Sequence, residues 1–267
     1  MVFISDSKNL RASNKNISVK RRWLFISIGV LFMLIVWQLL SMFFSEYVIA
    51  SPSATLKALG QLAVDGTLWK EFGNSLVRLL IGLVGGAIIG VTLGILAGLN
   101  KRLQFFLEPM RWGIMTIPAI IISVLVMLWF GMGSIQVILM TGVITMPVIY
   151  VNTLEGMLAI DARILEMAKV YNIQSQLKLT EIYLPGIGSS VMAGFTLASG
   201  IGVRASILAE FIGGRNGIGH NLFLSWTFLD TPTLFAWIIT TFALLGLVEF
   251  AVLKPIRDHL MRWKRTL

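Results

Sequence analysis

The chain contains no cysteine, and only two of its 267 residues are histidines. The absence of cysteine excludes disulfides, thiolate metal sites and cysteine nucleophiles. The dipeptide Gly-Lys does not occur, so there is no P-loop, and neither Gly-x-Gly-x-x-Gly nor Gly-x-Ser-x-Gly is found. His220 and His259 fall on opposite sides of the predicted membrane spans, which excludes a metal site built from that pair. The sequence therefore gives no basis for catalysis and predicts no metal or cofactor in this chain.

Charged residues are also scarce. They make up 13% of the chain, against about a quarter in a typical soluble domain. With 56% hydrophobic residues and a mean hydropathy of +0.83, the composition indicates an integral membrane protein. Segments that are apolar and long enough to cross about 30 Å of hydrocarbon predict an all-α fold with about six transmembrane helices. These segments are residues 23–45, 74–99, 112–131, 134–152, 187–209 and 233–253.

Positive charge is concentrated on one side of the predicted spans. If the amino terminus is cytoplasmic, the outer segments carry only Lys57, Lys70 and Arg215. This bias predicts that both termini lie in the cytoplasm. The net charge of +9 is then a topology signal, strengthened by attraction to anionic membrane lipid, and it does not indicate nucleic-acid binding. The cytoplasmic cations are Lys8, Arg11, Lys15, Lys20, Arg21, Arg22, Lys101, Arg102, Arg111, Arg163, Lys169, Lys178, Lys254, Arg257, Arg262, Lys264 and Arg265.

The first apolar run is longer than the apolar core of a signal peptide, which is about 7–15 residues, and no convincing cleavage site follows it. It is therefore interpreted as an uncleaved signal anchor. The predicted organisation is a basic cytoplasmic tail (1–22), a first transmembrane helix with an external segment (23–73), a five-helix core (74–257) and a second cytoplasmic tail (258–267). Pro118 and Pro147 are expected to kink the third and fourth spans.

Two spans carry ladders of small residues at every fourth position. Such residues share one helical face and allow helix backbones to approach closely in a membrane. Tight helix packing is the simpler interpretation, and sliding of these faces past each other during a transport cycle is the alternative. The ladders are Gly82, Gly86, Gly90, Gly94 and Gly98 in the second span, and Gly186, Ser190, Gly194, Ala198 and Gly202 in the fifth.

A polar segment, residues 155–185, interrupts the apolar core between the fourth and fifth spans. This segment carries too many charged residues to lie within the lipid, yet its apolar residues recur at helical spacing. The pattern predicts two short amphipathic helices separated by a break near Tyr171–Asn172. A turn between helices favours a residue that tolerates a left-handed backbone, and asparagine is the best substitute for glycine there.

Part of this segment resembles the "EAA" signature of membrane subunits of ATP-binding-cassette importers, Glu-Ala-Ala-x3-Gly-x9-Ile-x-Leu-Pro. Five positions match at the right spacing, whereas Met167 replaces an alanine and Asn172 replaces the glycine. Within that family the chain is most similar to the nitrate, sulfonate, taurine and bicarbonate group, which also includes permeases for pyrimidine-type vitamin precursors. Supporting stretches are Asn74-Ser75-Leu76-x-Arg78, Leu128–Gly133, Ala209–Gly214 and Asn216–Gly219. The coupling-loop residues are Glu166, Met167, Ala168, Asn172, Ile182, Leu184 and Pro185.

The resemblance implies a type I importer core in the inner membrane of a bacterial-type cell. The loop would dock as a short helix into a cleft of a separate ATPase, and an amphipathic helix in a groove is a recurring protein contact. The chain would need two ATPase subunits that bind the ATP, an extracytoplasmic solute-binding protein, and a second copy of itself or a paralogue. A loop that merely lies on the membrane surface is the alternative interpretation.

Arg78 and Arg204 are candidate residues of the translocation pathway, together with Glu210 near the outer end of the fifth span. Two arginines facing an inner cavity would favour an anion, because guanidinium presents paired donors to sulfonate, nitrate or carboxylate. Snorkelling to the outer interface or pairing with Glu210 are the simpler explanations.

Two other functions remain open from the sequence. An ion-driven secondary transporter would be expected to carry acidic residues in mid-span, and none lies there. A membrane scaffold that recruits a cytoplasmic partner through the loop would be indifferent to Arg78 and Arg204. The sequence therefore favours the permease subunit of an importer for a small solute, with an organic or inorganic anion as the expected cargo.

Overall fold

The computed structural model describes residues 19–253 and 255, and every regular element within this part of the chain is helical. Five helices are long and apolar enough to cross a membrane, and the number is six if one bent pair of helices is counted as a single span. The prediction of an all-α protein with about six spans is confirmed. Of the predicted basic tails, residues 1–18 and 258–267 lie outside the described residues, and His259 lies there too.

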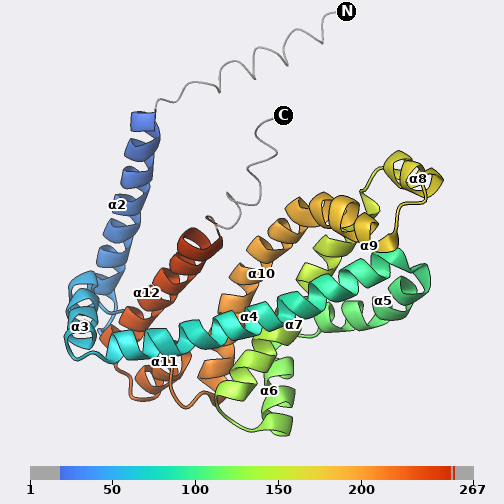
Figure 1. Ribbon diagram of the computed structural model, residues 1–267. Coiled ribbons are helices and arrows are strands. Elements are labelled where there is room, and N and C mark those ends of the chain that lie inside the picture. The colour runs from blue at the N-terminus through green and yellow to red at the C-terminus, as the bar shows by residue number, and fades with distance from the viewer. Residues whose placement is uncertain (1–18, 254, 256–267) are drawn as a thin grey trace, which may run out of the picture.

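Figure 1 shows α8 at one end of the molecule and α3 and α11 at the other. The helices before the central polar loop are α2 (Val19–Phe43), α3 (Pro52–Val64), α4 (Thr67–Leu99), α5 (Lys101–Thr116), α6 (Ala119–Phe130) and α7 (Ser134–Leu158). Those that follow are α8 (Ala162–Val170), α9 (Ser175–Lys178), α10 (Leu184–Gly213), α11 (Ile218–Thr227) and α12 (Thr231–Leu247), with π-helical segments η1 (Leu179–Tyr183) and η2 (Val248–Leu253).

Helix α7 packs against both α4 and α10 (Figure 1). Residues of all three helices meet in one apolar cluster, which consists of Ile149 of α7, Leu83 and Ala87 of α4, and Ala198 of α10. The fully buried side chains of this cluster lie near the middle of each helix. The three long helices therefore form one packed unit, with α7 as its shared element.

The two ladders of small residues both face α7. A Cβ atom added at Gly90 of α4 would lie 2.7 Å from the carbonyl oxygen of Met146, and one added at Gly194 of α10 would lie 2.8 Å from the Cβ of Asn152. No side chain fits at such distances. The ladders thus allow the α4 and α10 backbones to lie directly on α7, on two different sides of it.

The segment predicted as the third span, residues 112–131, is divided between two helices. Helices α5 and α6 meet at Ile117–Pro118 with a bend of 103°. Pro118 has no N–H to donate, which disfavours a continuous helix at this position, and the expected kink is observed. The apolar run seen in the sequence joins the end of α5 to α6, whereas the first half of α5 is more polar.

Helix α2 stands apart from the rest of the bundle, as the sequence predicted. None of its apolar span is buried inside the molecule. Its anchor is Trp37, whose ring stacks on Phe235 and whose indole N–H donates to the carbonyl of Ala50 at 2.9 Å. The packed core also begins earlier than residue 74, because α4 starts at Thr67.

Candidate functional site

Helix α8 contains the Glu166-Met167-Ala168 part of the loop signature. Asp161 caps its first turn, and the side chain accepts a hydrogen bond from the N–H of Arg163 at 2.9 Å. At its other end Asn172 has a φ of 49°, the left-handed conformation expected there. The N–H groups of Asn172 and Ile173 donate to the carbonyls of Lys169 and Ala168, which is a Schellman motif. The helix thus has a defined beginning and end.

One side of α8 exposes apolar side chains. Ala168 is fully buried, whereas Met167 is 50% exposed and Val170 is 79% exposed, and Ile164 and Tyr171 are exposed as well. Glu166 is also on the surface. Hydrophobic side chains that gather on a short helix outside the membrane indicate a surface for a protein partner.

The second half of the loop does not form a separate amphipathic helix, and that prediction is wrong. Residues Ser175–Gly213 run as one continuous helical segment into the fifth span. The cause of its π-helical turn is Pro185, which lacks an N–H and would clash with the carbonyl four residues before it. Leu184 instead donates to the carbonyl of Leu179, five residues back, which widens the helix. Ile182, Leu184 and Pro185 therefore form the joint between the loop and α10.

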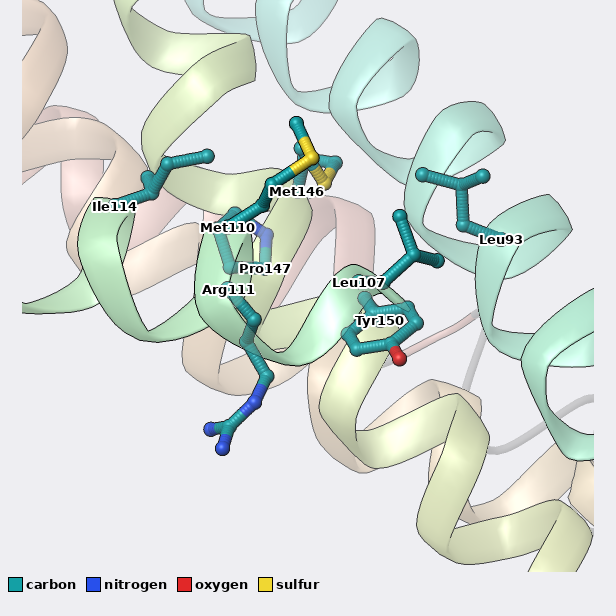
Figure 2. Close-up of a pocket in the computed structure, with 8 residues that line it drawn as sticks. All are labelled: Leu93, Leu107, Met110, Arg111, Ile114, Met146, Pro147 and Tyr150. Carbon is teal, nitrogen blue, oxygen red and sulfur yellow. The ribbon is translucent and has the colours of Figure 1, made fainter. Parts of the chain in front are cut away.

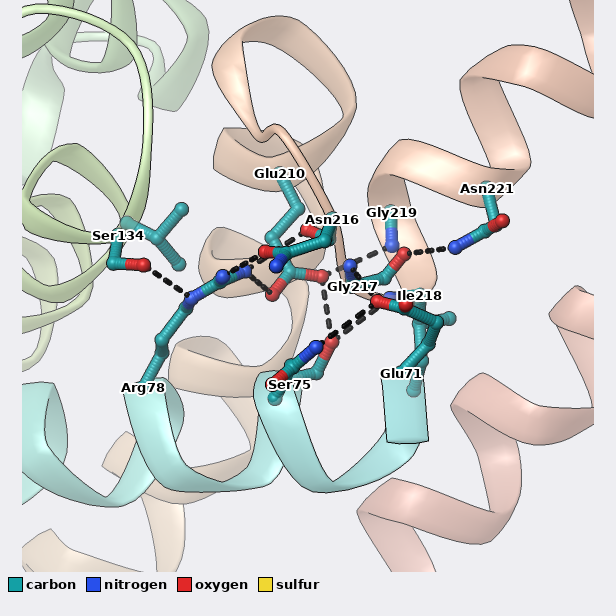
Figure 3. Close-up of polar contacts among 12 residues, drawn as sticks. Glu71, Ser75, Arg78, Ser134, Glu210, Asn216, Gly217, Ile218, Gly219 and Asn221 are labelled. Carbon is teal, nitrogen blue, oxygen red and sulfur yellow. Dashed lines mark hydrogen bonds and ion pairs between the residues drawn. The ribbon is translucent and has the colours of Figure 1, made fainter. Parts of the chain in front are cut away.

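A buried polar cluster lies at the other end of α10 (Figure 3). The Nη1 atom of Arg78 lies 3.0 Å from Oε1 of Glu210 and forms an ion pair, with both side chains buried. Arg78 also donates to Ser134 Oγ, to the Asn216 carbonyl oxygen and to Asn216 Oδ1. The pairing of Arg78 with Glu210, one of the simpler explanations considered from sequence, is thus observed.

The same cluster closes the beginning of α11. No side chain within α11 or its N-cap satisfies the first N–H groups of that helix. Residues of other helices do so: Glu71 accepts from Gly217, Ser75 from Ile218 and Glu210 from Gly219. These contacts fix α11 against α4 and α10 (Figure 3). A carboxylate near the amino end of a helix also interacts favourably with its dipole.

The cluster unites stretches that are far apart in the sequence. Ser75 and Arg78, Glu210, and Asn216–Gly219 come from three of the stretches that support the family resemblance. Glu71 and Ser134 were not singled out from sequence. Neither has a local pattern that marks it, because each contacts partners that are more than 50 residues away.

Arg204 has no contact with this cluster. It lies on an exposed side of α10 with Leu197 and Ile201, and no ion pair or hydrogen bond engages it within the described residues. Arg204 lies nine residues before the outer end of α10, which corresponds to about 14 Å along the helix axis. The two candidate arginines therefore have different surroundings: Arg78 is held in a buried network, and Arg204 is free.

An apolar cavity lies nearer the α8 end, between α4, α5 and α7 (Figure 2). It sits where Pro147 interrupts the hydrogen bonds of α7. Arg111 contributes its hydrocarbon stem, while its guanidinium turns away from the apolar side chains and pairs with Glu108. The lining residues are Leu93, Leu107, Met110, Arg111, Ile114, Met146, Pro147 and Tyr150.

Comparison with known proteins links these features to one family. The family described as "Binding-protein-dependent transport system inner membrane component" matches residues 90–262. The chain is 30% identical to the putative aliphatic sulfonates transport permease SsuC of Escherichia coli over 251 residues, which cover 91% of this chain and 94% of SsuC. It is 28% identical to the SsuC of Bacillus subtilis over 222 residues, which cover 83% of this chain and 80% of that one.

A similar fold occurs among solved structures. A chain of the MetNI methionine ABC transporter in an inward-facing conformation superposes with a TM-score of 0.64. It is 17% identical, and the match covers 73% of this chain and 96% of that chain. At this level of sequence identity, the similarity establishes a shared fold only.

Proposed function

Given that this chain belongs to the family of binding-protein-dependent transport system inner membrane components, we propose that α8 is the contact through which a separate ATPase drives it. The chain is the membrane-spanning permease subunit of an ATP-binding-cassette importer, and it is an integral protein of the inner membrane. The family implies ATPase and solute-binding-protein partners. We propose that ATP binds only to the ATPase subunits and that this chain itself catalyses no reaction.

The observation that supports the coupling role is the surface of α8. A short, capped helix exposes Met167 and Val170 beside Glu166, which suits a groove with an apolar floor and a basic rim. Displacement of the loop would be passed to α10 through the helical joint at η1, which has no break. From α10 it would pass to α7, on which the ladder residues lie at backbone distance.

We further propose that two copies of this chain enclose one pathway. Arg204 supports this assignment, because an unpaired arginine on a membrane span costs at least about 2.5 kcal/mol in lipid at the helix centre. A pathway that holds water, formed where two copies face each other, would remove that cost. When the ATPase dimer closes on ATP, it would move both α8 helices and open the pathway to the outside. Hydrolysis of the ATP would then return the transporter to its starting state.

The proposed cargo is a small anion, with an alkanesulfonate as the leading candidate. Both SsuC relatives named above are described as permeases for aliphatic sulfonates. A sulfonate also suits Arg204, because guanidinium donates two parallel hydrogen bonds to such a group. Nitrate and bicarbonate remain within the same class of small anion, whereas taurine shares the sulfonate group but also carries an ammonium group.

The coupling role is tested by purifying the tagged chain in mild detergent and identifying the proteins that accompany it. We expect an ATPase subunit to copurify, and Glu166→Lys to remove it because the charge on the docking helix is reversed. Glu155→Lys makes the same change at an exposed position of α7 outside α8, and it should retain the ATPase. Equal retention by both variants would contradict the assignment of α8.

A further inference from the structure

A second cavity lies at the outer end of the molecule, between the turn that joins α6 to α7 and the turn that joins α10 to α11. Its volume is about 380 Å³, which lies within the range of small-molecule sites, about 300–1,000 Å³. Its polar lining consists of Ser134, Arg215 and Asn216. Its apolar lining comes from Phe130, Met132 and Ile135. It is called here the outer cavity.

The buried cluster behind the outer cavity determines which hydrogen bonds its wall can make. Arg78 can only donate, so Ser134 Oγ and Asn216 Oδ1 must both accept from it. The Ser134 hydroxyl hydrogen and the Asn216 amide group are then left to donate. Within the described residues, no hydrogen bond from either donor is observed. The polar side chains in the wall of the outer cavity therefore have hydrogen-bond donors to spare.

The charged residues at the outer cavity also favour a ligand that accepts hydrogen bonds. Arg215 is exposed and takes part in no ion pair within the described residues. Arg78 and Glu210 lie behind the wall and offset each other as a buried pair. No carboxylate lines the outer cavity. Arg215 is also one of few cations outside the membrane, where the topology signal disfavours them.

We propose that the outer cavity binds an alkanesulfonate. The sulfonate oxygens accept hydrogen bonds from Arg215, Ser134 and Asn216, and the alkyl chain lies against Phe130 and Met132. A cavity whose polar side chains have donors to spare and which carries one positive charge favours a ligand that accepts, whereas a zwitterion or a cation leaves a charge without a partner. The choice of sulfonate among oxyanions rests on the proposed function. Arg215 is the residue that sets this selectivity, at the outer mouth of the permease.

The absence of cysteine provides a direct test. Met132→Cys places one thiol in the outer cavity of the full chain in membrane vesicles, and Ile135→Cys is the second reporter if the first does not fold. The thiol is labelled with a sulfonatoethyl or a trimethylammonioethyl methanethiosulfonate, and the two rates are compared. Arg215→Gln is expected to lower the ratio of anionic to cationic rates about tenfold. The control Lys70→Gln removes an outer cation on α4 and should leave the ratio unchanged.

Ethanesulfonate is the competing probe. It should slow labelling of Met132→Cys, with the protection lost in Arg215→Gln and unaffected in Lys70→Gln. The assignment of this site is overturned if Arg215→Gln does not change the ratio of the two labelling rates. It is also overturned if ethanesulfonate does not slow the labelling. Labelling needs neither ATP nor uptake. Protection without sulfonate uptake would therefore contradict the proposed cargo alone, and uptake without protection would overturn the outer cavity alone.

Discussion

At the scale of single residues, the buried pair of Arg78 and Glu210 determines how the outer end is held together. Glu210 accepts from Ser75 at 2.7 Å and from the N–H of Gly219 at 3.0 Å, besides pairing with Arg78. Removing one member of such a pair leaves a buried charge without compensation, which costs about 3–5 kcal/mol. One of the contacts that fix α11, from the N–H of Gly219, is made to the same carboxylate.

Arg78→Gln should therefore lower the thermal stability of the purified chain in detergent by an amount equivalent to about 3–5 kcal/mol. The double variant Arg78→Gln, Glu210→Gln should regain part of that loss, because no buried charge is left unpaired. The melting temperatures of the wild type and of the two variants make the comparison. A single variant as stable as the wild type would contradict the structural role of the pair.

The glycines of α4 allow a second test at this scale. Gly90→Ala puts a Cβ atom 2.7 Å from the Met146 carbonyl oxygen, whereas Gly85 in the same helix has no atom within 4 Å of the added carbon. Overpacking of this kind costs about 1–3 kcal/mol. We expect Gly90→Ala to lower the melting temperature and Gly85→Ala to leave it unchanged or raise it slightly. Equal effects of both substitutions would mean that α4 and α7 are not in close contact.

At the scale of elements, the sequence predicted what local chemistry decides. The kink at Pro118 and the left-handed Asn172 follow from the conformational limits of those residue types. Apolar runs likewise located the five long spans. The sequence did not predict the 103° angle between α5 and α6, because that angle depends on packing against α7. It also did not predict that α9 runs on into α10. The cluster around Glu210 joins helices distant in sequence, and no single segment indicates it.

The π-helical joint between α9 and α10 leads to a prediction about coupling. Pro185→Ala restores an N–H that can donate to the carbonyl of Glu181, so the turn can become α-helical. Loss of the extra residue in that turn would rotate the loop by about 100° relative to α10. The ATPase should then still copurify while uptake falls severalfold. Pro255→Ala, beyond η2 and away from the loop, is the control, and equal uptake by the two variants would contradict a role for this joint.

At the scale of the whole molecule, α8 and α11 lie at opposite ends of one packed unit (Figure 1). The buried polar cluster holds the beginning of α11. Helix α7 lies between α4 and α10 at backbone distance, and α10 runs from the loop joint to Glu210. Dense packing of this kind does not deform gradually, so a movement at one end is expected to displace whole helices. A movement of α8 is therefore expected to be transmitted through α10 and α7 to the outer end of the molecule.

The most direct measurement of this claim is uptake of radiolabelled ethanesulfonate into proteoliposomes that contain the complete transporter. Each transporter in the vesicles contains two copies of the chain and its ATPase subunits. ATP is supplied inside, on the side of the ATPase, and the solute-binding protein is added outside. Accumulation should require ATP and the binding protein, fall strongly with Arg204→Gln although the complex still assembles, and disappear with Glu166→Lys. Uptake driven by an ion gradient without ATP, or no ATP-dependent uptake of any small anion, would contradict the proposed function.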